Sequence, residues 1–258
     1  MLFDLRGKRK RAVQVTYAAL ALIFLVGFVG FSIGSGNAPG GLLDALGLGS
    51  NSGSSGSLST QFDPQINSAN ARLAKHPNDT QALLKLAKYE YFKGKQGVTQ
   101  NQTTGQVSIS QDAHTELGHS ADAWEKYLRA NKGAPNPSVA GYMVQVYFLL
   151  NDAQGAATAQ QIVAQHTPSS GSYGQLAFYR YASFDIPAGD AAAKKAESLA
   201  PKVQRKQISG QLTSIRKQAV KLKKQQAKAQ KAAKQAGTST TPGQNPLQNP
   251  FGGVGSGP

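Results

Sequence analysis

Residues 123–130, with the sequence AWEKYLRA, and the following Pro135 decide how the middle of this chain is interpreted. Ala123, Tyr127 and Ala130 recur at i, i+4 and i+7, which places them on one face of a helix. Charged side chains stand between them, so the opposite face suits water. A proline soon afterwards is typical of the end of a helix. The stretch therefore predicts an amphipathic helix that buries one narrow face.

Prolines recur at a fixed spacing around this helix. The interval from Pro135 to Pro168 equals the interval from Pro168 to Pro201, whereas Pro77 lies farther before Pro135 than one such period. A helical pattern precedes the last proline as it precedes Pro135, and a second helical pattern begins after each of the first three. This period predicts an array of helical repeats over residues 61–200, and the longer first interval predicts an insertion in the first unit.

These patterns resemble the tetratricopeptide repeat (TPR), a helix–turn–helix of about 34 residues with consensus positions on both helices. Residues 123–135 match its second helix fully, whereas in the next unit Ala156 fits but Gln160 and Val163 depart from the consensus. Two sets of residues match its first helix: Leu83, Leu86 and Ala87, and then Tyr173, Leu176 and Ala177. The N-terminal segment and the third repeat are similar in style to small membrane-anchored TPR proteins of actinobacteria. The resemblance implies an all-α fold with a solenoid of about three helix pairs.

The resemblance also implies that a peptide or protein binds in a concave groove lined by the first helix of each repeat. Seven residues are expected to line this groove by their phase in the repeat: Leu84, Lys88, Tyr91, Gln145, Phe148, Phe178 and Tyr181. Several of these side chains suit the core between helices equally well, because they are apolar or aromatic.

The first repeat is interrupted by an insertion at residues 95–119. Its polar, turn-forming sequence predicts a loop at one edge of the solenoid, and the second helix of this unit is expected to begin near Ser120. His114, Glu116 and His119 lie at the end of this loop. Residues of these types bind zinc in metal sites, but two histidines near one acid in a polar loop are more often ordinary solvated residues. We therefore expect no metal site here.

The net charge of the chain is concentrated in two segments. The 258 residues carry 28 Lys and Arg against 13 Asp and Glu, a formal charge of +15. Residues 1–11 account for +4 of this charge, and residues 201–236 hold eleven bases and no acid. The rest of the chain holds 12 bases and 12 acids. The repeat region itself therefore gives no charge signal for an anionic partner.

Residues 12–33 are uncharged and mostly apolar, and they predict a transmembrane helix of about 30 Å. Five bases precede this run and the next base is Arg72, so we expect a single-pass protein of the cell membrane with a cytoplasmic N-terminus and an extracytoplasmic C-terminal domain. A cleaved signal peptide is the competing interpretation, but its apolar region is usually shorter. Gly30 and Gly34 have the spacing of a helix-dimer contact, which arises easily by chance in a glycine-rich segment.

Two segments of low complexity flank the repeat region and its basic extension. The Gly/Ser-rich residues 34–60 predict a flexible linker, because they offer too little apolar surface to offset chain entropy. The polar residues 237–258 predict a disordered tail for the same reason.

Residues 201–236 predict a long basic helix, since Ala, Lys, Gln and Leu dominate them. A narrow apolar stripe recurs at steps of four and three: Ile208, Leu212, Ile215, Ala219 and Leu222. This stripe is expected to cap the open end of the last repeat. The lysines of this helix either only keep it soluble or bind anionic lipid headgroups, an anionic cell-wall polymer or an acidic protein. The candidate residues are Lys217, Lys221, Lys223, Lys224, Lys228, Lys231 and Lys234.

The absence of cysteine excludes disulfides, cysteine-ligated metal sites and a thiol nucleophile. Hydrolase, phosphate-binding and metalloprotease motifs are also missing from the sequence, so we expect neither an enzyme nor a cofactor. The TPR resemblance implies a membrane-tethered scaffold or adaptor for envelope proteins. A chaperone-like accessory to protein export near the translocon, and a module that binds anionic lipid or wall polymer, are the alternatives. Nucleic acid is not expected, because the basic helix carries no interleaved aromatic residues to stack on bases and lies outside the cytoplasm in this topology.

Overall fold

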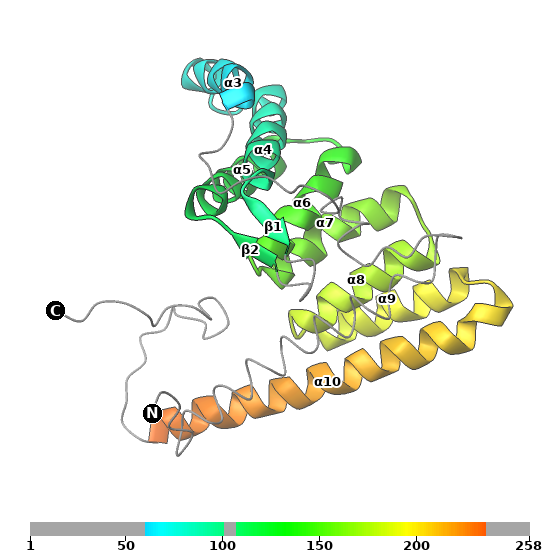
Figure 1. Ribbon diagram of the computed structural model, residues 1–258. Helices are drawn as coiled ribbons and strands as arrows, with labels where there is room; N and C mark the ends of the chain where they lie inside the picture. Colours follow the sequence, from blue (N-terminus) through cyan, green and yellow to red (C-terminus); the bar gives the residue numbers. More distant parts are fainter. Residues whose placement is uncertain (1–59, 101–106, 236–258) are drawn as a thin grey trace.

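The computed structural model describes residues 60–100 and 107–235, and most of them are helical (Figure 1). The elements follow in this order: η1 (Thr60–Phe62), α3 (Asp63–Lys75), α4 (Thr80–Lys95), β1 (Val98–Gln100), β2 (Val107–Ile109), α5 (Gln111–Ala130), α6 (Pro137–Leu149), α7 (Ala153–His166), α8 (Ser170–Ala182), α9 (Ile186–Leu199) and α10 (Lys202–Gln235). The all-α class predicted from the sequence is therefore confirmed for the described residues, with one short hairpin, β1–β2, as the departure.

The helices pack against one another in the order of the chain (Figure 1). We call α4–α5, α6–α7 and α8–α9 the first, second and third helix pairs. The helices of each pair contact each other, and each pair also contacts the next. One hydrophobic core runs through all three pairs, from Leu83 in α4 to Ala219 in α10. Packing of this kind is compatible with a helical repeat.

The turns within the second and third pairs have the same geometry and lie one proline period apart. Asn151 and Phe184 adopt φ angles of 59° and 61°, in a region that residues other than glycine seldom occupy. The next residue, Asp152 or Asp185, then caps the following helix by accepting hydrogen bonds from its backbone N–H groups. The period of the prolines is therefore also the period of these turns.

A tyrosine ring lies directly on a glycine in each of these two pairs. A Cβ atom added to Gly155 would overlap the ring of Tyr147, and one added to Gly189 would overlap the ring of Tyr181. Both tyrosines are buried. Glycine at these two positions therefore allows α7 and α9 to approach their partner helices closely.

The first pair is connected differently from the sequence prediction. α5 begins at Gln111, where Ser110 caps it, and not near Ser120. The reason is that the apolar face of this helix extends upstream, because Ala113 and Leu117 are fully buried. The insertion is therefore shorter than predicted, and its ends form the antiparallel strands β1 and β2.

α10 closes the array by packing against α8 and α9. The apolar stripe predicted for this helix is buried at four positions: Ile208, Leu212, Ile215 and Ala219. Leu222 is partly buried, and residues 223–231 are mostly exposed. In Figure 1 this end of α10 projects past α8 and α9, and residues 223–235 extend the helix by about 20 Å. The part of α10 up to Leu222 therefore packs into the fold, whereas most of the part beyond it does not.

Several sequence predictions concern residues that the structure does not describe. They are the basic segment 1–11, the transmembrane helix 12–33 with its Gly30 and Gly34 pair, the linker 34–60 up to its last residue, and the tail 237–258. Within residues 60–100 and 107–235, no helix is both long enough and apolar enough to cross a bilayer.

Candidate functional site

The seven residues predicted to line a groove do not share one exposed surface. Tyr91, Phe178 and Tyr181 are only 2%, 7% and 1% exposed, so their assignment to a groove is wrong. Their rings fill the core instead, and two of their hydroxyl groups have partly exposed hydrogen-bond partners. Tyr91 donates a hydrogen bond to Gln145, and Tyr181 donates one to Asp190 at 2.8 Å. The other four residues are partly exposed: Leu84, Lys88, Gln145 and Phe148.

A cluster of partly exposed aromatic side chains, which the sequence reasoning missed, lies across η1, α4 and α6. We call it the aromatic patch, and it consists of Phe62, Tyr89, Phe92 and Tyr142. The ring centroids of Phe92 and Tyr142 are 5.2 Å apart, and those of Phe62 and Phe92 are 5.8 Å apart. Lys88 adds a cation, because its Nζ lies 5.5 Å from the ring centroid of Tyr89 and 5.8 Å from that of Phe92.

The buried Tyr91 supports this patch from beneath. Its ring stacks on that of Tyr142, with centroids 5.2 Å apart and planes 16° apart. Burial, with a smaller effect of Tyr142, raises the pKa of Tyr91 to about 12. The signal in the sequence was the run YEYF at residues 89–92. Helical phase alone assigned Tyr91 of this run to the surface. Which of these aromatic residues is exposed depends on where α6 and η1 lie, and phase does not show that.

The lysines predicted to meet an anionic surface are exposed at six positions: Lys217, Lys221, Lys223, Lys224, Lys228 and Lys231. The side chain of Lys234 lies outside the described part of the chain. Lys223 has a structural role that the sequence did not show, because its Nζ donates a hydrogen bond to the carbonyl oxygen of Phe184 at 2.9 Å. This bond fastens α10 to the turn between α8 and α9.

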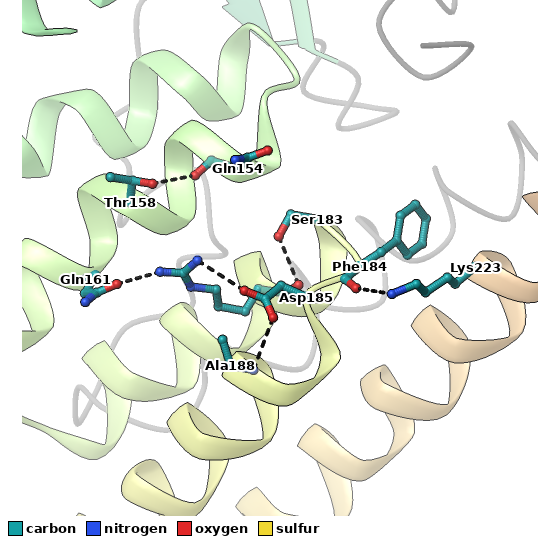
Figure 2. A network of polar contacts seen from close by, with 9 residues as sticks. Gln154, Thr158, Gln161, Ser183, Phe184, Asp185, Ala188 and Lys223 are labelled. Carbon is teal, nitrogen blue, oxygen red and sulfur yellow. Dashed lines mark hydrogen bonds and ion pairs between the residues drawn. The ribbon is translucent and has the colours of Figure 1, made fainter.

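Figure 2 shows this bond at one end of a polar network that connects α7, α8, α9 and α10. Arg180 of α8 donates to the side chain of Gln161 in α7 and contacts Asp185 Oδ2 at 3.4 Å. Asp185 also caps α9. The network holds the last turn of the array in place, and we regard it as structural.

A second polar group lies between α4 and α5, and we call it the carboxyl cluster. It consists of Glu90, Glu116 and His119, which each place one side-chain oxygen or nitrogen atom within 4.8 Å of the other two. Glu90 is 4% exposed, whereas the side chains of Glu116 and His119 are 17% and 58% exposed. Lys93 Nζ lies 2.9 Å from Glu116 Oε1 and 3.0 Å from Asp63 Oδ1. The cluster therefore runs from a buried carboxyl group to an imidazole that faces solvent.

The two acids of the carboxyl cluster are held in different protonation states. Burial, a hydrogen bond with Glu116 and the charge of Glu116 raise the pKa of Glu90 to about 8. Burial also acts to raise the pKa of Glu116, but hydrogen bonds with Glu90 and Lys93 outweigh it and lower that pKa. At neutral pH Glu90 therefore retains its proton and Glu116 is charged. Glu90 Oε2 has no hydrogen-bond partner, although it is buried.

Sequence reasoning found only part of the carboxyl cluster. It placed Glu116 and His119 in a polar loop, whereas the structure places them one turn apart on α5. His114, which was grouped with them, is exposed and does not belong to the cluster. Glu90 was missed because its proximity to α5 depends on how α4 and α5 pack.

Comparisons of this chain with family models, curated proteins and solved structures find no match. Membership of the TPR family therefore stays a prediction. The observations that bear on function are the aromatic patch, the exposed half of α10 and the carboxyl cluster of this chain itself.

Proposed function

We propose that this chain is a membrane-tethered scaffold of the TPR type that binds a protein or peptide at the aromatic patch. The observation that carries the proposal is the partial exposure of four aromatic rings where η1, α4 and α6 meet. Aromatic residues are enriched at the centre of protein interfaces, because a ring offers a large contact area for little conformational entropy. The patch replaces the predicted groove, three of whose residues belong to the core.

The outward face of α5 provides a contrast with the aromatic patch. Its exposed residues include Asp122, Glu125 and Lys126, and Glu125 pairs with Arg129 at 3.6 Å. A surface of this composition favours water. The patch has the opposite composition, because four rings lie together beside one cation and no acid pairs with Lys88 among the described ion pairs.

The composition of the patch indicates the chemistry of its partner. The rings suit apolar or aromatic side chains, and Lys88 suits a carboxylate at the edge of the same segment. We therefore propose that the ligand is a protein segment with apolar anchors and at least one acidic residue beside them.

Site-specific crosslinking tests this function. A photoreactive amino acid replaces Tyr89 in the patch or, as a matched control, Lys126 on the outward face of α5, in the full-length chain in its native membrane. We expect one defined product from position 89 and none from position 126. Equal labelling from both positions would count against the patch. Capture of many unfolded chains at position 89 would support the chaperone-like alternative in place of a scaffold.

The tether and the topology in this proposal rest on residues 1–33, which the structure does not describe. Basic residues before the apolar run favour a cytoplasmic N-terminus. A reporter enzyme that is active only outside the cytoplasm, fused after Pro258, tests the arrangement. Activity is expected, and an inactive reporter on a stable fusion would place the repeats in the cytoplasm and overturn the envelope setting.

A second candidate function rests on the projecting half of α10. Lys224, Lys228 and Lys231 are exposed there, α10 carries no acid, and no apolar side chain beyond Leu222 is buried in its described part. Each lysine near an anionic surface contributes about 1 kcal/mol, so only the cluster would hold the helix on such a surface. We propose that this half of α10 contacts anionic lipid headgroups.

The absence of native cysteine allows a direct test of this contact. A single Ala229→Cys substitution carries an environment-sensitive fluorophore, and the full-length chain is placed in lipid nanodiscs. We expect a spectral shift in anionic nanodiscs that is lost in zwitterionic ones, at high salt, and when Lys224, Lys228 and Lys231 are changed to Gln. The same spectrum in both lipids would contradict lipid binding, and a shift on adding a soluble polyanion alone would favour the wall polymer instead.

A further inference from the structure

We propose that the carboxyl cluster binds a divalent transition-metal ion, with Glu90, Glu116 and His119 as its three protein ligands. Their side-chain atoms lie within 4.8 Å of one another and come from two facing helices, α4 and α5. This site is separate from the aromatic patch and from the lysines of α10, so it does not depend on the proposed function.

The spacing on α5 suits metal binding. Glu116 and His119 stand at i and i+3, so their side chains lie on the same face of the helix, and Glu116 Oε2 is 3.4 Å from His119 Nδ1. Glu-x-x-His on one helix with a Glu from a facing helix is a ligand arrangement that helical metal sites use. Glu90 supplies the facing carboxyl group from α4.

The unpartnered oxygen of Glu90 is an independent observation that points to a ligand. Glu90 is 4% exposed, and its Oε2 atom has no hydrogen-bond partner. A buried acceptor without a partner is costly, and most buried polar groups in native proteins are satisfied. A cation bound by the Glu90 carboxyl group through Oε2 would satisfy this oxygen.

Lys93 and Asp63 take the role of supporting residues around these ligands. Lys93 Nζ contacts Glu116 Oε1, while the other oxygen of Glu116 faces His119. Outer contacts of this kind orient a ligating carboxylate and are part of most metal sites. Lys93 contacts the carboxyl groups of Asp63 and Glu116, and Glu90 is a third acid near it. Charge therefore also favours a divalent cation once Glu90 is ionised.

The ligand types restrict the choice of metal. Two carboxylates and one imidazole suit Zn²⁺, Mn²⁺ or Fe²⁺ better than Ca²⁺ or Mg²⁺, which prefer oxygen ligands alone. Bonds of about 2.0–2.2 Å place two ligand atoms at most about 4.4 Å apart, so any two ligand atoms that lie farther apart than this, within the 4.8 Å span of the cluster, would move closer together on binding. The exposed imidazole of His119 can make this movement, and it also provides the path of entry from solvent.

The competing interpretation is a carboxyl pair that shares a proton and binds no metal. The test uses the full-length chain in a mild detergent, treated with a chelator and then dialysed. Co²⁺ is titrated and followed by its visible absorption, and Zn²⁺ is titrated by calorimetry. We expect one ion per chain and a rise in the unfolding temperature on binding.

Two histidine variants give the decisive contrast. His119→Ala removes a proposed ligand from an exposed position, whereas His114→Ala removes an exposed histidine from the same helix without touching the cluster. We expect the His119→Ala chain to bind at least about tenfold more weakly and the His114→Ala chain to bind like the unaltered chain. Glu90→Gln should also weaken binding. An absence of saturable binding, or equal affinity of both histidine variants, would overturn the metal site in favour of the shared proton.

Discussion

Equivalent positions in the first and second helix pairs carry side chains of opposite character, a buried acid in α4 and a buried aromatic ring in α6. Glu90 and Tyr147 each lie eleven residues after the cap of their helix, Asp79 or Asn136, and both are buried. In the second pair the ring of Tyr147 packs on Gly155. In the first pair a carboxyl group takes the place of the ring and faces the carboxylate of Glu116.

The length of the connection between two helices decides which of their side chains meet. In the second pair a tight turn brings the glycine at the start of α7 under the tyrosine at the end of α6. In the first pair the β1–β2 hairpin separates the helices along the chain, and Glu116 and His119 of α5 lie near Glu90 of α4. A position that is structural in one pair is thereby available for binding in another.

The largest effect in this comparison is expected from removing the ring of Tyr147. Tyr147→Ala should lower the free energy of unfolding by about 3–5 kcal/mol, because the substitution leaves a cavity between α6 and α7. Chemical denaturation measures the change. Tyr173→Ala in α8, a tyrosine that is partly exposed, should cost about 1–2 kcal/mol. Equal losses of unfolding free energy would mean that the buried ring of Tyr147 on Gly155 stabilises the protein no more than the partly exposed ring of Tyr173.

Replacing the glycine beneath the Tyr147 ring with alanine should destabilise the protein, whereas the same substitution at a glycine with open space around it should stabilise it. Gly155→Ala is expected to destabilise the protein by about 1–3 kcal/mol, since the new methyl group overlaps the Tyr147 ring. Gly174→Ala in α8 has open space around it and should stabilise the protein by about 0.5–1 kcal/mol through helix propensity. The contrast in sign, measured by thermal unfolding of both variants, is the test. If both substitutions stabilised the protein, α7 would have to move away from the Tyr147 ring at little cost.

The carboxyl group that replaces the ring should make stability depend on pH. The folded chain keeps the proton of Glu90 up to about pH 8, whereas an unfolded chain releases it near 4.5. The folded state therefore binds more protons between these values, and stability should fall as pH rises, by at most about 1.4 kcal/mol per pH unit. Glu116, His119, Lys93 and Asp63 surround the group, and the low pKa of Glu116 acts mainly below this range.

Unfolding of the chelator-treated chain between pH 5 and pH 9 measures this dependence. Glu90→Gln should remove most of the slope, because the amide does not titrate. If stability changed with pH equally in this variant, the pH dependence would come from another group. The buried acid would then not distinguish the first helix pair from the second.

The smallest expected effect concerns the caps that begin the second helix of each pair. Asp152 accepts hydrogen bonds from the backbone N–H groups of Gln154 and Gly155, whereas Ser110 accepts one from Ala113 at 3.2 Å. Asp152→Ala should therefore cost about 1 kcal/mol, and Ser110→Ala less. Denaturant midpoints of the two variants give the ranking. The reverse order would mean that the hairpin fixes the start of α5 less firmly than the tight turn fixes α7.

Local patterns predicted the helices well and the surface poorly. The face of residues 123–130 and the stripe of α10 each describe a single helix, and most of their residues are buried. The proline period matches the spacing of the turns at Asn151 and Phe184. The groove prediction failed at Tyr91, Phe178 and Tyr181, because a helix in this array contacts neighbours on several sides. Phase within a repeat shows which residues share a face, and it does not show which neighbour covers that face.

Local sequence patterns were enough to predict the α-helical class, the regular period from Pro135 to Pro201 and the neutral repeat region between two basic segments. These features follow from side-chain spacing and charge along the chain. The packing of the helices brings Phe62, Tyr89, Phe92 and Tyr142 into one patch and places Glu90 near Glu116 and His119. The members of each group come from separate elements of the chain, so only the packing of α4 against α5, α6 and η1 brings them together.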